Sequence, residues 1–283
     1  MTVVLKIGGA RAVDPAGAVA DVASLTNTGE EVVVVHGGSS AVDETLEALG
    51  ETPTYVETPD GVVGRFTDER TMEVFEMVLP GRLNTDLVVD LQNAGVDAVG
   101  LSGVDGGLLT GPRKSAVRVK EDGKRKIKRG DHSGRIEAVN ETLLETLLTA
   151  GHTPVVTVPM LGQDDDEWLA VNADADRAAA AVAGALEATL VVLTDVPGVL
   201  ADPEDPETLI ERVETPAAMD RLQAAAEGFM RRKVMAATEA LESGASTVVV
   251  ADANVEAPVT TALDGGGTHI TADALEDSTN DTV

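Results

Sequence analysis

The sequence predicts an α/β fold in which a mostly parallel sheet carries helices on both faces. Short apolar runs rich in valine alternate with longer stretches that have alanine, valine and leucine at helical spacing. The runs predict buried strands at residues 3–7, 32–35, 97–101, 152–158, 189–193 and 247–251. The stretches between them predict helices near residues 15–28, 41–49, 67–79, 82–94, 141–150, 172–185, 216–226 and 228–241. Strands that alternate with helices pair in parallel, because each helix carries the chain back across the sheet.

Length and composition limit the class of protein. A chain of 283 residues can form one large α/β domain or two closely packed lobes. It has no cysteine, and its four histidines lack the spacing of metal ligands, so we expect no disulfide and no transition-metal site. It also has no run of about 18 uncharged apolar residues and no signal-peptide pattern, so we expect a cytoplasmic protein outside any membrane.

The chain carries a formal net charge of −28, from 49 acidic and 21 basic residues. Because the acids are spread over the whole chain, we interpret this composition as the surface of a salt-adapted, halophilic protein. An ordinary acidic protein is the alternative. Either surface should repel nucleic acid and anionic membranes, and we expect neither as a partner.

Lysine is scarce, which makes the position of each lysine informative. Seven are present, of which five lie between residues 113 and 135, and the other two are Lys6 and Lys233. These two lysines lie far from the cluster and from each other in a chain that otherwise contains almost no lysine. We therefore expect each of them to have a specific role.

Two predicted strands end in glycine-rich turns that suit an anion. The first strand carries Lys6 and ends at Gly8-Gly9, and the second runs into His36-Gly37-Gly38-Ser39 before a helix. Glycine lets the backbone turn tightly with its N–H groups exposed, and the start of a helix adds the positive end of a dipole. Parallel strands put both turns at one edge of the sheet, so we expect phosphate to bind there.

The segment Gly64-Arg65-Phe66-Thr67 precedes a predicted amphipathic helix. Thr67 is the expected N-cap of that helix. Arg65 lies just before the cap, where its five donors suit a substrate carboxylate. On spacing alone, a solvated arginine in an acid-rich loop explains the residue equally well.

Residues 113–135, which we call the basic arm, reverse the charge balance of the rest of the chain. They hold ten of the 21 bases and only three acids. Alternation around Val117, Val119 and Ile127, with Asp122-Gly123 between, predicts a projecting β-hairpin. The arm could bind an acidic partner or substrate, balance nearby acids, or bind nucleic acid. We favour a negatively charged protein or substrate, because the arm lacks aromatic residues that stack on bases.

A further carboxylate site is predicted where the strand ending near Val171 meets an alanine-rich helix. Asn172 is the expected cap of that helix, and Asp174 and Asp176 then fall in its first turn, where the dipole favours negative charge. That role alone explains both acids. A helix of small residues packs closely on a sheet, however, so one of these carboxylates could lie near the strand ends and hold two lysines in place. The spacing leaves open which one.

Two segments of the carboxyl-terminal part also indicate ligand binding. Thr194-Asp195-Val196-Pro197-Gly198 follows a core strand, and ligands of open α/β sheets bind at such strand ends. Met230-Arg231-Arg232-Lys233 lies in the first turns of a helix. Three adjacent bases are unfavourable beside the positive end of a helix dipole, so we expect an anion nearby.

In order and spacing, six segments resemble the amino acid kinase family: Lys6-Ile7-Gly8-Gly9, His36-Gly37-Gly38, Gly64-Arg65-Phe66-Thr67, Asn172-Ala173-Asp174, Thr194-Asp195-Val196-Pro197-Gly198, and Met230 to Lys233. The resemblance covers roughly residues 3–270. It implies a three-layer α/β/α sandwich, ATP with Mg²⁺ as cofactor, and a homodimer. It also implies an amino lobe (1–180) that binds the acyl substrate and dimerises, and a carboxyl lobe (181–272) that binds ATP. The acidic residues at the end of the sequence predict a disordered tail (273–283).

The resemblance also implies roles for single residues. Catalysis would depend on Lys6, Lys233 and Asp174, which is the acid of the family's Asn-Ala-Asp motif and would orient both lysines. The residues implied for substrate binding are Gly37, Gly38, Ser39, Arg65 and Asn172. Those implied for nucleotide binding are Gly8, Gly9, Thr194, Asp195, Val196, Gly198 and Met230. No metal ligand of the protein's own is implied.

Within the family the chain resembles N-acetylglutamate kinases, and more closely the branch that phosphorylates glutamate or 2-aminoadipate on a LysW-type amino-group carrier protein. The implied product is an acyl phosphate in arginine or lysine biosynthesis. A kinase for free N-acetylglutamate and a non-catalytic nucleotide or amino-acid sensor are the alternatives. Since the carrier in this resemblance is small and strongly acidic, we expect it to dock on Lys114, Arg118, Lys120, Lys124, Arg125, Lys126, Lys128 and Arg129.

Overall fold

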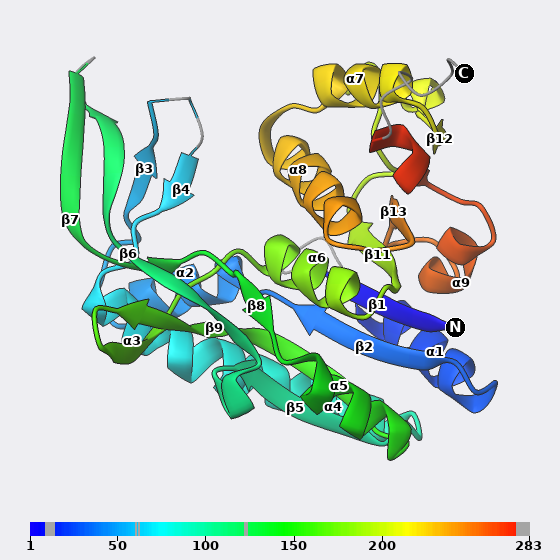
Figure 1. Cartoon of the computed structure of the whole chain (residues 1–283), viewed down its shortest axis with the longest axis horizontal. Coiled ribbons are helices and arrows are strands. Elements are labelled where there is room, and N and C mark those ends of the chain that lie inside the picture. The colour runs from blue at the N-terminus through cyan, green and yellow to red at the C-terminus, as the bar shows by residue number, and fades with distance from the viewer. Residues whose placement is uncertain (9–14, 60, 62, 122–123, 276–283) are drawn as a thin grey trace, which may run out of the picture.

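A computed structural model describes residues 1–8, 15–59, 61, 63–121 and 124–275 (Figure 1). Gly9, implied in nucleotide binding, and Asp122-Gly123, the expected turn of the basic arm, lie outside these residues. Among the described residues, no helix is both long and apolar enough to cross a membrane.

Twelve strands of the described residues form one sheet, with β12-β14-β13-β11-β1-β2-β9-β6-β7 as its main path. The central pairs β13–β11, β11–β1, β1–β2 and β2–β9 are all parallel, which confirms the predicted mostly parallel sheet. The strands are β1 (Thr2–Ile7), β2 (Glu31–His36), β5 (Ala98–Gly103), β6 (Leu109–Glu121), β7 (Lys124–Gly134), β8 (Ala138–Val139), β9 (Thr153–Asp164), β10 (Glu167–Val171), β11 (Thr189–Thr194), β12 (Arg212–Val213), β13 (Thr247–Asp252) and β14 (Thr268–Thr271).

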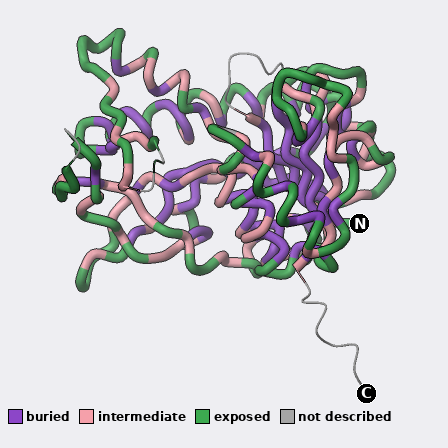
Figure 2. The backbone as a smooth tube through the Cα atoms, turned by 90° about the horizontal axis from the view of Figure 1, so that it is seen from above, coloured by how far each residue is buried: buried purple, intermediate pink, exposed green. Residues whose placement is uncertain are grey.

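Helices cover both faces of this sheet, so the fold is the expected three-layer α/β/α sandwich. One hydrophobic cluster joins the sheet to α1 (Pro15–Asn27), α4 (Asn84–Asn93) and α9 (Pro258–Leu263). A second joins the opposite face to α2 (Ser39–Ala48), α3 (Glu69–Glu76), α5 (Glu141–Thr149), α6 (Ala175–Ala185), α7 (Pro216–Ala225) and α8 (Gly228–Glu242). Figure 2 shows the buried backbone running through the middle of the molecule between exposed outer segments.

The alternation of side chains along β1 explains where Lys6 points. Val3 and Leu5 pack into the cluster of α1, α4 and α9, whereas Val4 packs into the cluster that contains α6. Successive side chains of a strand point to opposite faces, so Lys6 shares the side of Val4. The only lysine near the amino terminus is therefore directed toward α6.

The segment between β4 (Val63–Arg65) and β5 differs from the expected pair of helices. Helix α3 passes into a π-helix, η1 (Met77–Leu83), which contains Pro80 and continues into α4. Proline lacks the N–H of a regular helical hydrogen bond, which accounts for the widened turn. The N-cap of α3 is Asp68, whose side chain accepts the Thr71 N–H at 2.8 Å, so the prediction that Thr67 caps this helix is wrong.

The basic arm is the predicted hairpin. Strands β6 and β7 pair antiparallel from Arg113 opposite Gly134 to Glu121 opposite Lys124. The hairpin projects from the body beside a separate two-stranded sheet of β3 (Tyr55–Glu57) and β4 (Val63–Arg65) (Figure 1).

The two proposed lobes share one sheet, since β11 pairs with β1 across the boundary near residue 180. Short 3-10 turns lie at η2 (Asp105–Gly107), η3 (Pro206–Thr208) and η4 (Ala272–Leu275). Residues 273–275, which we expected in a disordered tail, belong to η4, where Ala274 is buried. The rest of the expected tail, 276–283, lies outside the described residues.

Candidate active site

Lys6 and Lys233 converge on one carboxylate, that of Asp176. Lys6 Nζ lies 2.5 Å from Asp176 Oδ1, and Lys233 Nζ lies 3.6 Å from Oδ2. All three side chains are at most 15% exposed. The expected meeting of two lysines that are more than 200 residues apart is confirmed; their part in catalysis stays a prediction.

The acid between the lysines is not the one that we expected. Asp174 is the N-cap of α6, and its Oδ1 accepts the N–H groups of Asp176 (2.9 Å) and Arg177 (3.1 Å). A capping side chain turns back onto its own helix. Asp176, two residues later in the first turn, reaches the lysines instead. The expectation that Asp174 orients them is therefore wrong, and so is the expectation that Asn172 caps this helix.

Burial and charge act in opposite directions on this triad. Burial raises the pKa of Asp176, but the ammonium groups of Lys6 and Lys233 outweigh it and hold the pKa below its usual value. Burial lowers the pKa of Lys233, and repulsion by Lys6 lowers it further, against the attraction of Asp176 and Asp174. Both ammonium groups contact the carboxylate of Asp176, and the positive end of the α6 dipole lies beside them. Such a site attracts an anion.

The glycine turn after β2 lies against this triad. A Cβ at Gly37 would lie 3.2 Å from the Ala175 side chain, so the turn approaches the first residue of α6 closely. A Cβ at Gly38 would lie 2.2 Å from Leu83 of η1, which explains why glycine is needed there. The described part of the predicted cradle, Gly8 at the end of β1 and Gly37-Gly38 at the end of β2, is brought to one sheet edge because β1 and β2 pair in parallel.

His36 is the last residue of β2. Its imidazole is neutral and holds the glycine turn through hydrogen bonds. Burial lowers its pKa to about 4. Its Nδ1 lies 3.1 Å from the Gly37 carbonyl, and its Nε2 lies 3.0 Å from Asn84 Nδ2. The amide of Asn84 can only donate to Nε2, so Nδ1 carries the proton and donates to Gly37. His36 therefore holds the turn without adding charge.

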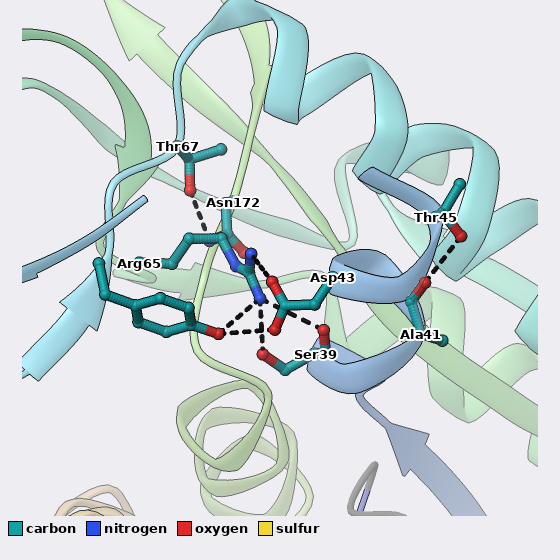
Figure 3. Close-up of polar contacts among 8 residues, drawn as sticks. Ser39, Ala41, Asp43, Thr45, Arg65, Thr67 and Asn172 are labelled. Atoms are coloured by element: carbon teal, nitrogen blue, oxygen red, sulfur yellow. Dashed lines mark hydrogen bonds and ion pairs between the residues drawn. The ribbon is translucent and has the colours of Figure 1, made fainter. Parts of the chain in front are cut away.

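Arg65 lies in a cage of polar groups and two aromatic rings. Figure 3 shows its contacts with Ser39 and Asp43. Its Nη1 forms a 2.5 Å ion pair with Asp43, and its Nη2 donates to Ser39 Oγ at 3.0 Å and to the Tyr55 hydroxyl at 2.8 Å. The guanidinium lies 4.9 Å from the Tyr55 ring and 5.5 Å from the Phe75 ring. The Arg65 side chain is only 5% exposed. These contacts fix the position of the Arg65 side chain, and the interpretation of Arg65 as a solvated arginine in a loop is wrong.

Thr67 joins Arg65, Asn172 and the root of the basic arm. Its N–H donates to Asp131 Oδ1 at 3.1 Å, its carbonyl accepts the His132 N–H at 2.7 Å, and its Oγ1 accepts from Asn172 Nδ2 at 3.1 Å. Thr67 and Asp131 are fully buried. Figure 3 shows the hydrogen bond between Thr67 and Asn172. The buried Oδ1 of Asn172 has no partner among the described residues, and it can accept an N–H from a ligand.

Apart from the glycines after β1, the residues expected to bind the nucleotide lie after the carboxyl end of β11 and on α8. Thr194 ends β11, Asp195 is exposed and Val196 is partly buried. Gly198 has a structural reason to be glycine, because a Cβ there would lie 2.7 Å from Leu209 and Thr268. Met230 precedes Lys233 by three residues on α8, so both lie on one side of the helix.

The sequence contained signals for two groups that we missed. Tyr55 is the only tyrosine of the chain, and in a protein with 2% aromatic residues it merits the attention given to the isolated lysines. Asp43 lies four residues after Ser39, on the same side of α2, and both contact Arg65. Among the described residues, no group of three His, Cys, Asp or Glu side chains is placed to hold a metal ion.

A parallel α/β/α sheet that gathers two buried lysines, a carboxylate and glycine turns at one edge defines a site for phosphate groups. The family model "Amino acid kinase family" matches residues 1–252, and the chain belongs to this family. The predicted family and fold are thereby confirmed.

Three relatives locate the chain within the family. The [LysW]-aminoadipate kinase of Thermus thermophilus is 44% identical over 95% of this chain and 99% of its own. The acetylglutamate kinase of Methanopyrus kandleri is 41% identical over 94% of this chain and 99% of its own. The solved N-acetylglutamate synthase of Neisseria gonorrhoeae, complexed with coenzyme A and N-acetyl-glutamate, matches with a TM-score of 0.75 and 26% identity. That match covers 95% of this chain and 59% of the synthase chain.

Proposed function

We propose that this protein transfers the γ-phosphoryl group of ATP to the side-chain carboxylate of glutamate or 2-aminoadipate carried on a LysW-type carrier protein. The observation that carries the proposal is the convergence of Lys6 and Lys233 on Asp176 beside the glycine turns. The names of the relatives support the choice of acceptor, since a [LysW]-aminoadipate kinase is 44% identical.

The acceptor carboxylate is already ionised, so catalysis consists of aligning two anions and neutralising charge. A carboxylate oxygen bonds to the γ-phosphorus, the bond to the bridging oxygen breaks, and ADP leaves with the electron pair. Lys6 and Lys233 flank the transferring group, and Asp176 holds both lysines in place. The N–H groups of Gly8, Gly9 and Gly38 hold phosphoryl oxygens. Mg²⁺ bound to the nucleotide supplies further charge neutralisation.

Arg65 and Asn172 hold the other end of the acceptor. Arg65 donates to the carboxylate at that end, and the unpartnered Oδ1 of Asn172 accepts the N–H of the amide that links the amino acid to its carrier. Gly37 and Ser39 complete the acceptor site. Thr194, Asp195, Val196, Gly198 and Met230 line the nucleotide site.

The carrier docks on the basic arm. The root of the arm bonds to Thr67 through Asp131, and Thr67 bonds to Asn172, so the arm is continuous with the proposed acceptor site. The whole chain has 49 acidic and 21 basic residues, and this excess of acids supports a salt-adapted enzyme. We place that enzyme in the cytoplasm. Homodimerisation through the amino lobe follows from the family resemblance, and sedimentation velocity tests it.

A hydroxamate assay for acyl phosphate tests the proposed function. The purified chain is incubated with ATP, Mg²⁺ and one of three acceptors: carrier-bound glutamate, carrier-bound 2-aminoadipate, or free N-acetylglutamate. We expect product with a carrier-bound acceptor. Product with free N-acetylglutamate alone would favour the second candidate, which the 41% identical acetylglutamate kinase supports. No product with any acceptor would overturn both and leave a non-catalytic sensor.

A further inference from the structure

The two faces of the basic arm differ, as the register of its strands shows. Residues directly opposite each other in an antiparallel pair project to the same side. The pairs Arg118–Ile127, Lys120–Arg125 and Ala116–Arg129 define one side, which we call the outer face. The pairs Val117–Lys128, Val119–Lys126 and Glu121–Lys124 define the other, which we call the inner face.

The inner face is turned toward the body of the protein. Val119 is 1% exposed, and Lys128 Nζ lies 4.0 Å from the centre of the Phe66 ring. Phe66 adjoins Arg65, so Lys128 packs against the loop that carries the acceptor site. Lys126 forms a 2.9 Å ion pair with Glu121 of the same face. Val119 and Lys128 therefore pack within the chain, whereas Lys124 and Lys126, near the tip of the hairpin, are exposed.

The outer face is exposed to solvent and combines basic side chains with an exposed isoleucine. Four bases, Arg118, Lys120, Arg125 and Arg129, surround Ile127, and all five residues are exposed. Ile127 is 65% exposed, although isoleucine normally avoids water. Arg118, Arg125 and Arg129 form no ion pair with any residue that the structure describes. Lys120 contacts Glu57 at 3.7 Å across a half-exposed pair, which contributes little.

We propose that the outer face alone is the docking surface for an acidic protein domain, with Ile127 as the apolar anchor and Arg118, Arg125 and Arg129 as the charge contacts. This inference rests on the proposed function and specifies how its carrier partner is held. A central apolar side chain within a ring of polar groups is the usual anatomy of a protein interface. Arginine, which outnumbers lysine on this face, is suited to paired contacts with carboxylates.

Charge complementarity selects the partner. The chain as a whole carries −28, so an acidic domain is repelled by the body and attracted only by the projecting arm. Nucleic acid fits less well, because the outer face has no aromatic side chain to stack on bases and the body repels a phosphate backbone. On the inner face, a partner that bound Lys128 would break its contact with Phe66.

Matched double variants on the two faces test the proposal. Arg118→Glu with Arg129→Glu changes the outer face, and Lys124→Glu with Lys126→Glu makes the same change in charge on the inner face. Binding of an unloaded LysW-type carrier protein to the full chain is measured by isothermal titration calorimetry. Because the unloaded carrier bears no acceptor, the measurement is independent of phosphoryl transfer. Thermal unfolding midpoints show that each variant is folded.

We expect the outer-face variant to raise the Kd at least about tenfold and the inner-face variant to change it less than about threefold. Ile127→Ala should weaken binding about tenfold as well. Raising KCl from about 0.5 M to about 2 M should weaken wild-type binding but leave the effect of Ile127→Ala in place, since salt screens charges and does not screen apolar contact.

Three results would overturn the face assignment: equal losses from both double variants, a loss from the inner-face variant alone, or wild-type binding by both. Tighter binding of a duplex oligonucleotide than of the carrier would also overturn it. Failure of the proposed function looks different, because then the wild-type chain does not phosphorylate the loaded carrier. A wild type that phosphorylates the loaded carrier, together with an outer-face variant that binds normally, shows that only the face assignment is wrong.

Discussion

The basic residues of this protein occur in two settings that differ in burial. Lys6 and Lys233 are at most 14% exposed and share the carboxylate of Asp176. The bases of the outer face of the arm are exposed, and three of its arginines have no ion-pair partner among the described residues. The first setting fixes cations in place in a region of low dielectric, and the second displays them to solvent.

This difference determines what each set of charges can do. Fixed, poorly solvated cations stabilise a charge that develops at one point, and they need no reorganisation when it appears. Exposed cations attract a large partner, but salt screens them and each contributes little alone. We therefore expect single substitutions at the triad to have large effects that salt does not alter, and substitutions on the arm to have smaller, salt-dependent effects.

Loss of either buried lysine should have the largest effect. We expect Lys233→Ala and Lys6→Ala each to lower kcat by about a thousandfold or more, because one side of the transferring phosphoryl group loses its compensating charge. The hydroxamate assay measures kcat, and circular dichroism confirms the fold. The loss should be equal at low and high KCl. Wild-type rates in Lys233→Ala would falsify the assignment of the site.

The two acids at the start of α6 should respond differently to the same change. Asp176→Asn removes the carboxylate between the lysines, and we expect kcat to fall about a hundredfold. Asp174→Asn is the matched control, since asparagine caps a helix as well as aspartate does. We expect that control to stay within about threefold of wild type in kcat and within about 0.5 kcal/mol in stability. The reverse ranking in steady-state kinetics would show that Asp174 is the organising acid.

Asp43 should affect binding of the acceptor and not turnover. Asp43→Asn weakens a charge-assisted contact to the largely buried Arg65, so we expect KM for the acceptor to rise about tenfold. The KM for ATP and kcat should change less than about threefold, because Arg65 has no hydrogen bond or ion pair with Lys6, Lys233 or Asp176 among the described residues. Tyr55→Phe keeps the aromatic ring beside Arg65 and removes only the hydroxyl, so it should have a smaller effect. A fall in KM in Asp43→Asn would mean that Asp43 competes with the acceptor for Arg65.

The pH dependence of kcat/KM should report the burial of Lys233. Its pKa is lowered from 10.5, chiefly by burial and then by Lys6, so the ammonium group loses its proton below that pH. We expect the alkaline limb of kcat/KM to fall below pH 10.5, because the neutral amine no longer stabilises the phosphoryl charge. Lys233→Arg should be slower but should lose this limb, since the guanidinium stays charged. If Lys233→Arg keeps the same alkaline limb of kcat/KM, the group that titrates is not Lys233.

Local patterns allowed several features to be predicted. Valine-rich runs and helical spacing indicated the parallel α/β/α fold, and alternation around Val117 and Ile127 indicated the hairpin. The rarity of lysine singled out Lys6 and Lys233. Each of these inferences depends on periodicity or composition, which the chain displays without reference to distant residues.

Other features depend on which groups meet across the fold. Asp174 and Asp176 are equivalent by spacing, and the choice of Asp176 follows from the capping geometry of α6 against β1 and α8. The cage of Asp43 and Tyr55 around Arg65 joins three separate segments, α2, β3 and β4. Similarly, Thr67 looked like a helix cap but donates to the root of the arm, because Asp68 provides the cap.

The sequence by itself determined the layered fold, two glycine turns and a lysine at one edge of the sheet, and a basic arm on an acidic body. Only the tertiary structure decided which carboxylate serves the two lysines, what holds Arg65, and which face of the arm is open. The physical reason is that strand and helix periods are set by neighbours a few residues away, whereas an ion pair depends on distances between groups that the packed sheet alone brings together.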